Sequence, residues 1–354
     1  MKYFFVLIFY VLVLPFVGVG YPAAAQASGV HYDAIVDSNY EGISGAEVNN
    51  VKMYSNVRRA IRDASGTARQ QYVIFIKKGE YYEKVNVDRS YVTLLGEDKD
   101  KTIITYDASA ATLDAQGNPW GTSRCATLTI RSTNFQAENL TIDNGFDYLG
   151  NAAKDKDDPT KIKNTQAVAL KLEGKSDKAI FRNVKVTGFQ DTIFADAGRS
   201  YFLDSYISGN VDFIFGSGQA VFNQCDIASR RRGYIAAPST NANQKYGILI
   251  INSHLMREGP EVADGSVNLG RPWHAWGVVN SEVAFINCIM DSHISLKGWD
   301  KMSKDLPEEN RMYEYGSTGP GAKMNSYRET FVLSDESAKD YTIENVLNGW
   351  DPEE

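Results

Sequence analysis

Residues 188–218 read GFQDTIFADAGRSYFLDSYISGNVDFIFGSG, and this stretch holds a repeat that predicts the fold. Asp191 and Asp212 lie 21 residues apart, each in a short apolar segment typical of a β-strand. Another polar pair, Asn183 and Asp204, repeats the same interval. Two matches at one spacing indicate a structural repeat of about that length. If each repeat is one coil of a stacked β-solenoid, the two aspartates lie on neighbouring parallel strands about 4.8 Å apart.

Similar units recur on both sides of this stretch, each a short apolar strand interrupted by one polar residue. These polar positions are Asn139, Asn183, Asp204, Gln224, Asn252 and Asn287, at intervals of 44, 21, 20, 28 and 35 residues. The first interval corresponds to about two coils, and the longer later ones indicate loops inserted on one side. The polar side chains suit stacked turns in which they bond free backbone groups. A β-sandwich also has regularly spaced short strands, but the likeness between the units favours an all-β solenoid.

The segments at the two ends of this array are expected to close it. Residues 55–64 carry apolar residues at helical spacing, with Ser55 as the N-cap, and a helix here covers the open end of a solenoid. Residues 32–36 resemble a first strand. Beyond Lys297 the repeat fades, residues 301–326 are expected to be mostly loop, and residues 342–347 a short helix.

The N-terminal sequence predicts an exported protein. Lys2 precedes an apolar run from Tyr3 to Val19, and Ala25 to Ala27 fit a cleavage site. An uncleaved anchor is the alternative, because about 17 apolar residues are at the short limit for a membrane span. We assign residues 1–27 to a signal peptide and residues 28–354 to one domain, extracellular or periplasmic and not bound to membrane after cleavage.

Charge and composition exclude several classes of partner. The net charge of −7 argues against nucleic acid, although the basic residues 230–232 suit either an anionic ligand or a solvated turn. Of the three cysteines, Cys225 and Cys288 occupy apolar strand positions and Cys125 lies apart, so buried free thiols are expected, with one disulfide as the alternative. The four histidines lack ligand spacing and no CxxC pair occurs, so neither metal nor cofactor is expected.

Asp191 and Asp212 are the first candidates for chemistry. A lone strand aspartate is more often a turn or cap residue, but the shared register favours a functional pair. Two stacked carboxylates need a proton or a nearby cation, and Arg271 in the segment NLGRPW is a candidate cation. Paired carboxylates in different environments can divide nucleophilic and acid–base roles.

Amide and aromatic side chains complete a candidate groove. Gln166 lies 24 residues before Gln190, near one coil, and amide donors aimed at one point stabilise an oxyanion. Gln190 directly precedes Asp191, so both face one groove only if the backbone bends there. Trp273 lies in a loop beside Arg271 and suits the apolar face of a sugar ring; core packing is the stronger interpretation for Trp299. These residues favour carbohydrate chemistry but leave ester hydrolysis, glycoside hydrolysis and lyase chemistry open.

The chain closely resembles the pectin methylesterases, particularly their bacterial exported members. Four motifs occur in the family's order: QAVAL from Gln166, GFQDT from Gly188, VDFIFG from Val211 and LGRPW from Leu269. FIKKGEYYEKV, VTLLGE and GWDKM are also similar to family segments, and the similarity runs from about Tyr32 to the C-terminus. The resemblance implies a single-stranded right-handed parallel β-helix that removes the C6 methyl esters of pectin (homogalacturonan), releasing methanol without a metal.

The resemblance also implies roles for individual residues. Asp212 would be the nucleophile and Asp191 the proton donor and later the general base, while Gln190 and Gln166 would hold the oxyanion and Arg271 would keep Asp212 ionised. The residues that would contact the sugar are Trp273, Arg271, Gln166, Phe215, Thr122 and Met302.

The sequence departs from the family pattern at a few positions. Phe189 replaces a frequent tyrosine, Phe194 lacks a hydroxyl group, and Trp276 follows a shortened segment after LGRPW. The acidic balance leads us to expect a preference for heavily methylated, less charged pectin. The alternatives are a glycoside hydrolase or lyase on a similar β-helix, for which a further catalytic carboxylate or histidine, or a calcium-binding acidic cluster, would be expected, an esterase acting on another ester, and a non-catalytic sugar-binding solenoid. A monomer is the expected state.

Overall fold

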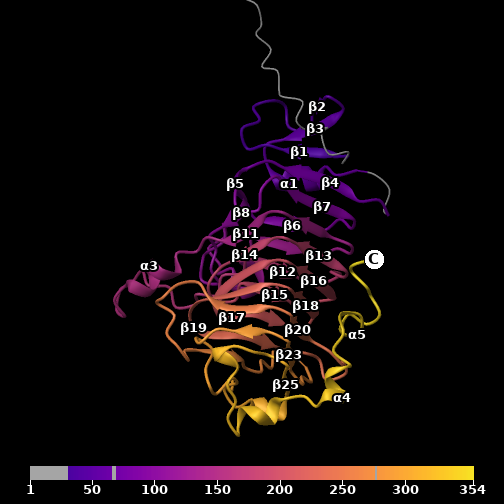
Figure 1. Ribbon diagram of the computed structural model, residues 1–354. Coiled ribbons are helices and arrows are strands. Elements are labelled where there is room, and N and C mark those ends of the chain that lie inside the picture. Colours follow the sequence, from indigo (N-terminus) through magenta and orange to yellow (C-terminus); the bar gives the residue numbers. More distant parts are fainter. Residues whose placement is uncertain (1–30, 66–68, 276) are drawn as a thin grey trace, which may run out of the picture. The chain divides into compact units, whose positions relative to one another are not determined.

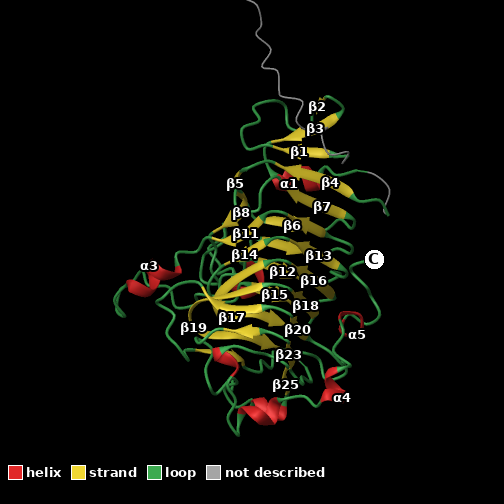
Figure 2. Ribbon diagram, viewed as in Figure 1, coloured by secondary structure: helices red, strands yellow, loops and turns green. Residues whose placement is uncertain are grey.

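The computed structural model describes residues 31–65, 69–275 and 277–354, of which the residues from Tyr32 to Glu354 form one compact unit. Within this unit short parallel strands stack on one another, passing from indigo to yellow along the chain in Figure 1. Figure 2 shows that strands and loops make up most of it and that its helices are short. The predicted all-β solenoid is therefore confirmed. The predicted signal peptide, residues 1–27, lies outside the described residues.

The first sheet forms one face of the solenoid. Its strands are parallel to their neighbours except at the β2–β3 pair, and from β4 onward they follow chain order. In spatial order they are β2 (Glu47–Val48), β3 (Val51–Tyr54), β1 (Ala34–Val36), β4 (Tyr72–Ile76), β7 (Val92–Gly96), β10 (Gln136–Glu138), β13 (Ala179–Arg182), β16 (Arg199–Leu203), β18 (Gln219–Asn223), β20 (Ile248–Ile251), β23 (Glu282–Ile286) and β25 (Arg311–Tyr315).

The second sheet bends into two further faces, because the long strands β17 (Tyr206–Gly216) and β19 (Asp226–Pro238) run through the corner between them. The second face also contains β5 (Gly79–Tyr82), β8 (Thr102–Tyr106), β11 (Thr141–Asn144), β14 (Lys185–Thr187), β21 (His254–Arg257) and β24 (Ile289–Met290). The third face also contains β6 (Val85–Val87), β9 (Leu128–Ile130), β12 (Leu170–Leu172), β15 (Ile193–Ala195) and β22 (Val267–Gly270). Three faces of stacked parallel strands make this unit a parallel β-helix.

The recurring polar residues form the turn between the first and second faces. All six adopt left-handed backbone conformations, with φ between 48° and 58°, a region in which Asn and Asp are favoured among residues with a side chain. Their side chains bond across coils: Asn139 Nδ2 donates to the carbonyl of Gly96 at 2.9 Å, and Asn183 Nδ2 donates to Asn139 Oδ1 at 3.1 Å. The expectation of stacked turn side chains is confirmed for these residues.

The intervals between the turn residues equal the register offsets of the paired strands on the first face. For example, Gln136 pairs with Ile180 and Ile248 pairs with Val283, which are offsets of 44 and 35 residues. Because β10 pairs directly with β13, the 44-residue interval is a single coil, and the expectation of two coils is wrong. The additional residues form an excursion between β11 and β12 that carries α3 (Tyr148–Ala153), visible at the left of Figure 1.

The helix near the N-terminus, α1 (Val57–Arg62), buries Val57, Ala60 and Ile61 in the core of the first coils. Its N-cap is Asn56, whose side chain accepts a hydrogen bond from the Arg59 backbone N–H, so the expectation of Ser55 as the cap is wrong by one residue. The nearly buried carboxylate of Glu83 accepts from two further N–H groups of the first turn, at 2.7 and 2.9 Å. This carboxylate satisfies donors that would otherwise be left unpaired at the helix start.

The array continues further towards the C-terminus than the sequence suggests. β25 pairs with β23 along its whole length, so the expectation that the solenoid fades beyond Lys297 is wrong. Trp299 is fully buried and Glu314 accepts a hydrogen bond from its Nε1 at 3.1 Å, which confirms a core role. Arg328, also fully buried, binds both carboxylate oxygens of Glu314, at 2.8 and 2.6 Å.

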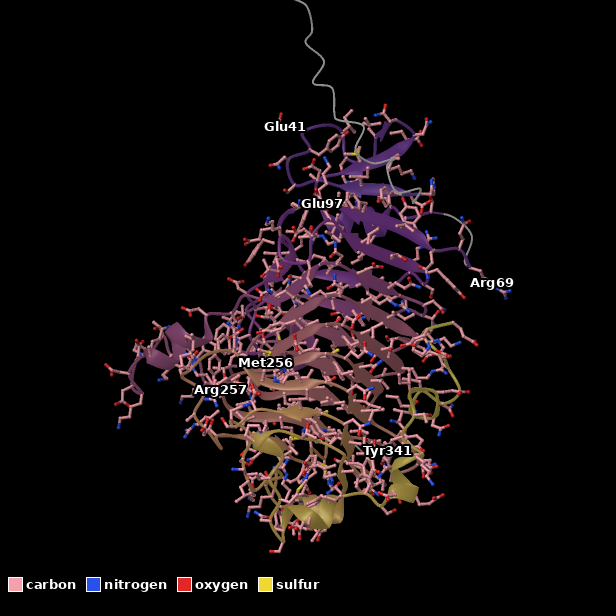
Figure 3. All side chains as sticks on the ribbon, viewed as in Figure 1. Glu41, Arg69, Glu97, Met256, Arg257 and Tyr341 are labelled. Carbon is pink, nitrogen blue, oxygen red and sulfur yellow. The ribbon has the colours of Figure 1, made fainter. Side chains whose placement is uncertain are left out.

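The remaining helical segments are single turns. They are α2 (Gly121–Arg124), η2 (Pro307–Glu309), η3 (Pro320–Ala322), η4 (Arg328–Phe331), α4 (Asp335–Ala338) and α5 (Ile343–Val346). Thr342 caps α5 through its side chain, as the sequence predicts. The C-terminal segment packs back on the first face: Tyr341, labelled in Figure 3, donates a hydrogen bond of 2.9 Å to Glu282 of β23.

Aligned aromatic side chains fill the interior of the coils. Phe202 lies between Phe181 and Phe222, with ring centroids 4.5 Å apart on each side. The three cysteines are buried and free, as expected. In the part of the chain that the structure describes, no three His, Cys, Asp or Glu side chains are grouped to hold a metal ion. None of the described helices has the length and apolar character needed to span a membrane.

Candidate active site

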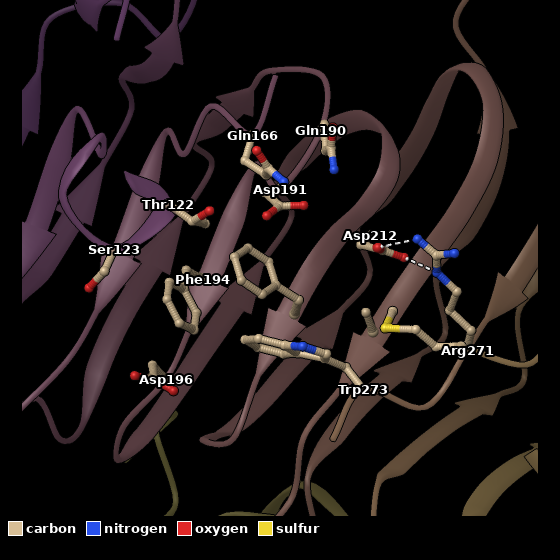
Figure 4. A pocket seen from close by; sticks show the side chains of 13 residues that line it. Thr122, Ser123, Gln166, Gln190, Asp191, Phe194, Asp196, Asp212, Arg271 and Trp273 are labelled. Carbon is tan, nitrogen blue, oxygen red and sulfur yellow. Dashed lines mark hydrogen bonds and ion pairs between the residues drawn. The ribbon is translucent and has the colours of Figure 1, made fainter. Parts of the chain in front are cut away.

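A pocket of about 520 Å³ opens on the outer side of the third face (Figure 4). All nine residues that the sequence predicts for the site line it: Thr122, Gln166, Gln190, Asp191, Asp212, Phe215, Arg271, Trp273 and Met302. They come from several coils and from loops separated by more than a hundred residues of sequence. The stacking of the coils therefore brings the candidate residues together, and their roles remain to be tested.

Asp191 and Asp212 occupy equivalent places on adjacent strands. Each precedes by two residues a member of the strand pair Ile193 and Ile214, and the backbone N–H of Asp191 donates to the carbonyl of Val211 at 3.0 Å. Both aspartates have left-handed backbone conformations, with φ of 64° and 51°. These local bends interrupt the strand alternation, and both carboxylates line the pocket although each is almost buried.

Arg271 is the cation of the pocket, and it binds only one of the two carboxylates. Its Nε and Nη2 donate to the two oxygens of Asp212 at 2.9 and 2.6 Å (Figure 4). The guanidinium also lies 4.0 Å over the ring of Tyr234, whose hydroxyl donates to Asp300 at 3.1 Å. Ring and carboxylate together fix the plane of the guanidinium, and a bidentate pair of this geometry is strong.

Burial and charge give the two carboxyl groups different acidities. Burial, together with the nearby charge of Asp212, raises the pKa of Asp191 well above its ordinary value. Burial also raises the pKa of Asp212, but the two hydrogen bonds from Arg271 oppose that rise directly. We therefore expect a proton on Asp191 and a negative charge on Asp212 over the same pH range.

The two glutamines lie beside Asp191 at one end of the pocket (Figure 4). Gln190 Oε1 accepts a hydrogen bond of 2.8 Å from Thr165 Oγ1, which leaves the amide nitrogen directed towards the pocket. Gln166 lies outside the expected register, because the Ala167 N–H bonds the carbonyl of Gln190 at 3.0 Å and the offset is 23 residues rather than 24. Gln166 Oε1 is buried and has no hydrogen-bond partner among the described residues.

Aromatic rings form the opposite wall. Phe194 and Phe215 stack with centroids 4.3 Å apart, and Trp273 lies 6.1 and 5.6 Å from them at tilted angles. Thr122 and Met302 line the same cavity from neighbouring loops. Such an apolar wall facing a row of polar groups suits a sugar ring, which has an apolar face and polar edges.

Four lining residues were not predicted as site residues: Ser123, Phe194, Asp196 and Ala237. The signal for two of them was present, since inward and outward positions alternate along a strand. Ile193 and Ala195 belong to the main core, whereas Phe194 and Asp196 lie on the outer side with the pocket. The signal for Ser123 and Ala237 is absent, because a small residue in a loop or strand marks no particular chemistry.

Two other sequence features lie elsewhere. In the basic stretch at 230–232, Arg230 pairs with Glu258 at 2.7 Å and Arg231 with Glu261 at 2.6 Å, and neither lines the pocket. Trp276, noted as a departure from the family pattern, lies outside the described residues.

A parallel β-helix with a carboxylate pair, a guanidinium, amide donors and an aromatic wall in one outer pocket defines a carbohydrate-active protein. Comparison with known proteins specifies the class further. A family model described as Pectinesterase matches residues 46–350. Pectinesterase A from Dickeya chrysanthemi is 40% identical over 354 residues, which cover 92% of this chain and 95% of the relative.

Solved structures agree with the sequence comparison. The chain is similar to the pectin methylesterase from Yersinia enterocolitica, with a TM-score of 0.80 and 42% identity over 84% of this chain and 99% of that one. It is also similar to a pectin methylesterase solved in complex with a hexasaccharide, with a TM-score of 0.82 and 38% identity over 91% and 99% of the two chains. The chain belongs to the pectinesterase family, whose members are carboxylic ester hydrolases. The family and the fold class inferred from the sequence motifs are thus confirmed.

Proposed function

We propose that this pectinesterase hydrolyses the C6 methyl esters of homogalacturonan, with Asp212 as the nucleophile and Asp191 as the proton donor and later the general base. The observation that carries this assignment is the asymmetry of the pair. Arg271 binds both oxygens of Asp212, while no described side chain forms a hydrogen bond with the carboxyl group of Asp191. A nucleophile must be ionised and a proton donor must be protonated, and the two environments favour those states respectively.

In the first half of the reaction, a carboxylate oxygen of Asp212 attacks the ester carbonyl carbon. The amide groups of Gln190 and Gln166 donate hydrogen bonds to the negative oxygen that develops. When the tetrahedral intermediate collapses, the bond to the methoxy oxygen breaks and Asp191 gives that oxygen its proton. Methanol leaves, and the galacturonosyl group remains joined to Asp212 as an acyl–enzyme anhydride.

In the second half, Asp191 is a carboxylate and accepts a proton from a water molecule. That water attacks the acyl carbon, the bond to Asp212 breaks, and the products are a galacturonate carboxylate and the original enzyme. Because Asp191 ends with the proton that it first gave away, each turnover is balanced. Arg271 holds Asp212 in place throughout and disperses its returning charge.

The aromatic wall is the proposed site of the sugar ring that carries the reacting ester. Trp273, Phe194 and Phe215 offer apolar surface, and Thr122 and Met302 border it. For the protein as a whole we propose export through the signal peptide at residues 1–27 and action on pectin as a monomer.

Product analysis tests this function directly. The mature chain is incubated with heavily methylated pectin, and methanol and polymer length are measured in the same samples. Methanol release at constant length is the expected result. Shortened chains would instead support a glycoside hydrolase or lyase, and binding without methanol release would support a sugar-binding solenoid or another ester as the substrate.

A further inference from the structure

Asp196 is a charged residue of the pocket to which the proposed mechanism gives no role. It follows β15 and lies on the same outer side as Phe194, near Trp273 and away from Asp212 (Figure 4). Its Oδ1 accepts a hydrogen bond of 2.9 Å from Ser217 Oγ. Among the described residues, no Lys, Arg or His lies within ion-pair distance of it.

The charges of the pocket leave Asp196 without compensation. Arg271 is neutralised by its bidentate pair with Asp212. Asp191 is held neutral by its buried environment at the start of the reaction. Asp196 therefore gives the pocket a net negative charge near the aromatic wall on which the sugar chain is proposed to lie.

This charge distinguishes the two kinds of ring found along partly methylated pectin. A methyl-esterified galacturonosyl residue is neutral, whereas a de-esterified one carries a carboxylate. A fixed carboxylate in a partly buried pocket repels a free carboxylate within several ångströms and leaves a neutral ester unaffected. The same repulsion acts on the product, which has just gained a negative charge.

We propose that Asp196 is a specificity-determining residue that disfavours de-esterified rings beside the reacting ester. This proposal rests on the pectinesterase function proposed above, and it assigns to one residue the preference for heavily methylated pectin that the acidic sequence predicts. A half-buried carboxylate at this range changes the affinity for an anionic ring by about three- to tenfold.

The test compares Asp196→Asn with Glu336→Gln. The first change removes the charge and keeps an oxygen acceptor for Ser217. The second removes one negative charge from a side chain on α4 that is 87% exposed, so it controls for net charge alone. For each protein kcat/KM is measured on heavily and on sparsely methylated pectin of equal length, at low and high salt.

We expect the wild type to favour heavily methylated pectin, and Asp196→Asn to lower the ratio between the two substrates by about three- to tenfold at low salt. Added salt should reduce this difference, because screening weakens a charge effect and leaves a packing effect unchanged. Asp196→Glu should retain the wild-type preference. An unchanged ratio in Asp196→Asn, or an equal shift in Glu336→Gln, would overturn the proposal.

Calorimetric titration with unesterified oligogalacturonate separates this proposal from the proposed function. Asp196→Asn should bind this oligosaccharide about three- to tenfold more tightly than the wild type. That result supports the electrostatic role whether or not methanol is released, while equal affinities contradict it. A wild type that releases no methanol from any pectin would instead contradict the esterase activity.

Discussion

Asp191 and Asp212 lie at equivalent positions on neighbouring coils, but Arg271 binds only Asp212. The two carboxylates share a backbone conformation, a pocket and nearly complete burial. Their difference arises from one guanidinium, supplied by a loop about sixty residues further along the chain. The repeat places the carboxylates together, and Arg271 gives them different protonation states.

Asp191→Asn should inactivate the enzyme and stabilise it increasingly as the pH rises. The raised pKa of Asp191 means that, above the ordinary aspartate pKa, the folded protein holds a proton that the unfolded chain has released. The wild-type free energy of unfolding therefore falls as the pH rises through this range, by about 1.4 kcal/mol per pH unit between the two pKa values. Asn does not titrate, so the variant lacks this loss.

Urea unfolding of both proteins at pH 4 and pH 8 measures the effect. The stability gain of the variant should be larger at pH 8, and methanol release should fall by about 10²- to 10⁴-fold. Equal gains at the two pH values would show that Asp191 does not carry the raised pKa.

Tyr234 is expected to act as a positioning residue for Arg271. Tyr234→Ala removes the ring that lies against the guanidinium, and kcat should fall by about 2- to 30-fold as the bidentate pair loosens. The acid limb of the pH–rate profile should move to higher pH, because a loosened Arg271 stabilises ionised Asp212 less. Tyr234→Phe keeps the ring and loses only the hydrogen bond to Asp300, so it serves as the matched control. A lower kcat with an unmoved acid limb would assign Tyr234 to packing alone.

Arg328→Met should destabilise the C-terminal coil without altering the pocket chemistry. Arg328 and Glu314 are both fully buried and form a bidentate pair, so removal of one partner leaves an uncompensated charge. We expect a loss of about 3–5 kcal/mol in the free energy of unfolding, measured in urea. The double variant Glu314→Gln/Arg328→Met should recover much of this loss, since no buried charge then remains. A single variant that costs under about 1 kcal/mol would contradict this account.

Much of the fold is readable from sequence because each coil contains one residue with a demanding backbone conformation. The turn between the first two faces requires positive φ, and residues such as Asn183 and Asp204 satisfy it. Their spacing therefore records the register of every coil. The 44-residue interval was misread as two coils because an inserted loop and an additional coil lengthen the sequence alike.

The site was less readable, since its geometry depends on bends and loops. Residue spacing brought Asp191 and Asp212 together, but their left-handed conformations are not evident from apolar segments that resemble ordinary strands. The bidentate contact of Arg271 depends on a loop whose path the repeat does not determine. Asp196 could have been included through strand alternation with Phe194.

The backbone conformation of Asp212 decides how its proposed role should be tested. Its φ of 51° is tolerated better by Asp and Asn than by Ala, so Asp212→Ala would combine backbone strain with the loss of the carboxylate. Asp212→Asn removes the nucleophile and keeps a residue suited to this conformation. Asp204→Asn is the matched control, because Asp204 has a φ of 49° and is exposed on the turn between other faces.

The most direct measurement is methanol release from heavily methylated pectin by the wild type, Asp212→Asn and Asp204→Asn, with polymer length followed in the same samples. The account predicts a loss of at least about 10³-fold in Asp212→Asn, wild-type activity in Asp204→Asn, and constant polymer length throughout. Methanol release by folded Asp212→Asn at a rate near that of the wild type would contradict the assignment of Asp212 as the nucleophile.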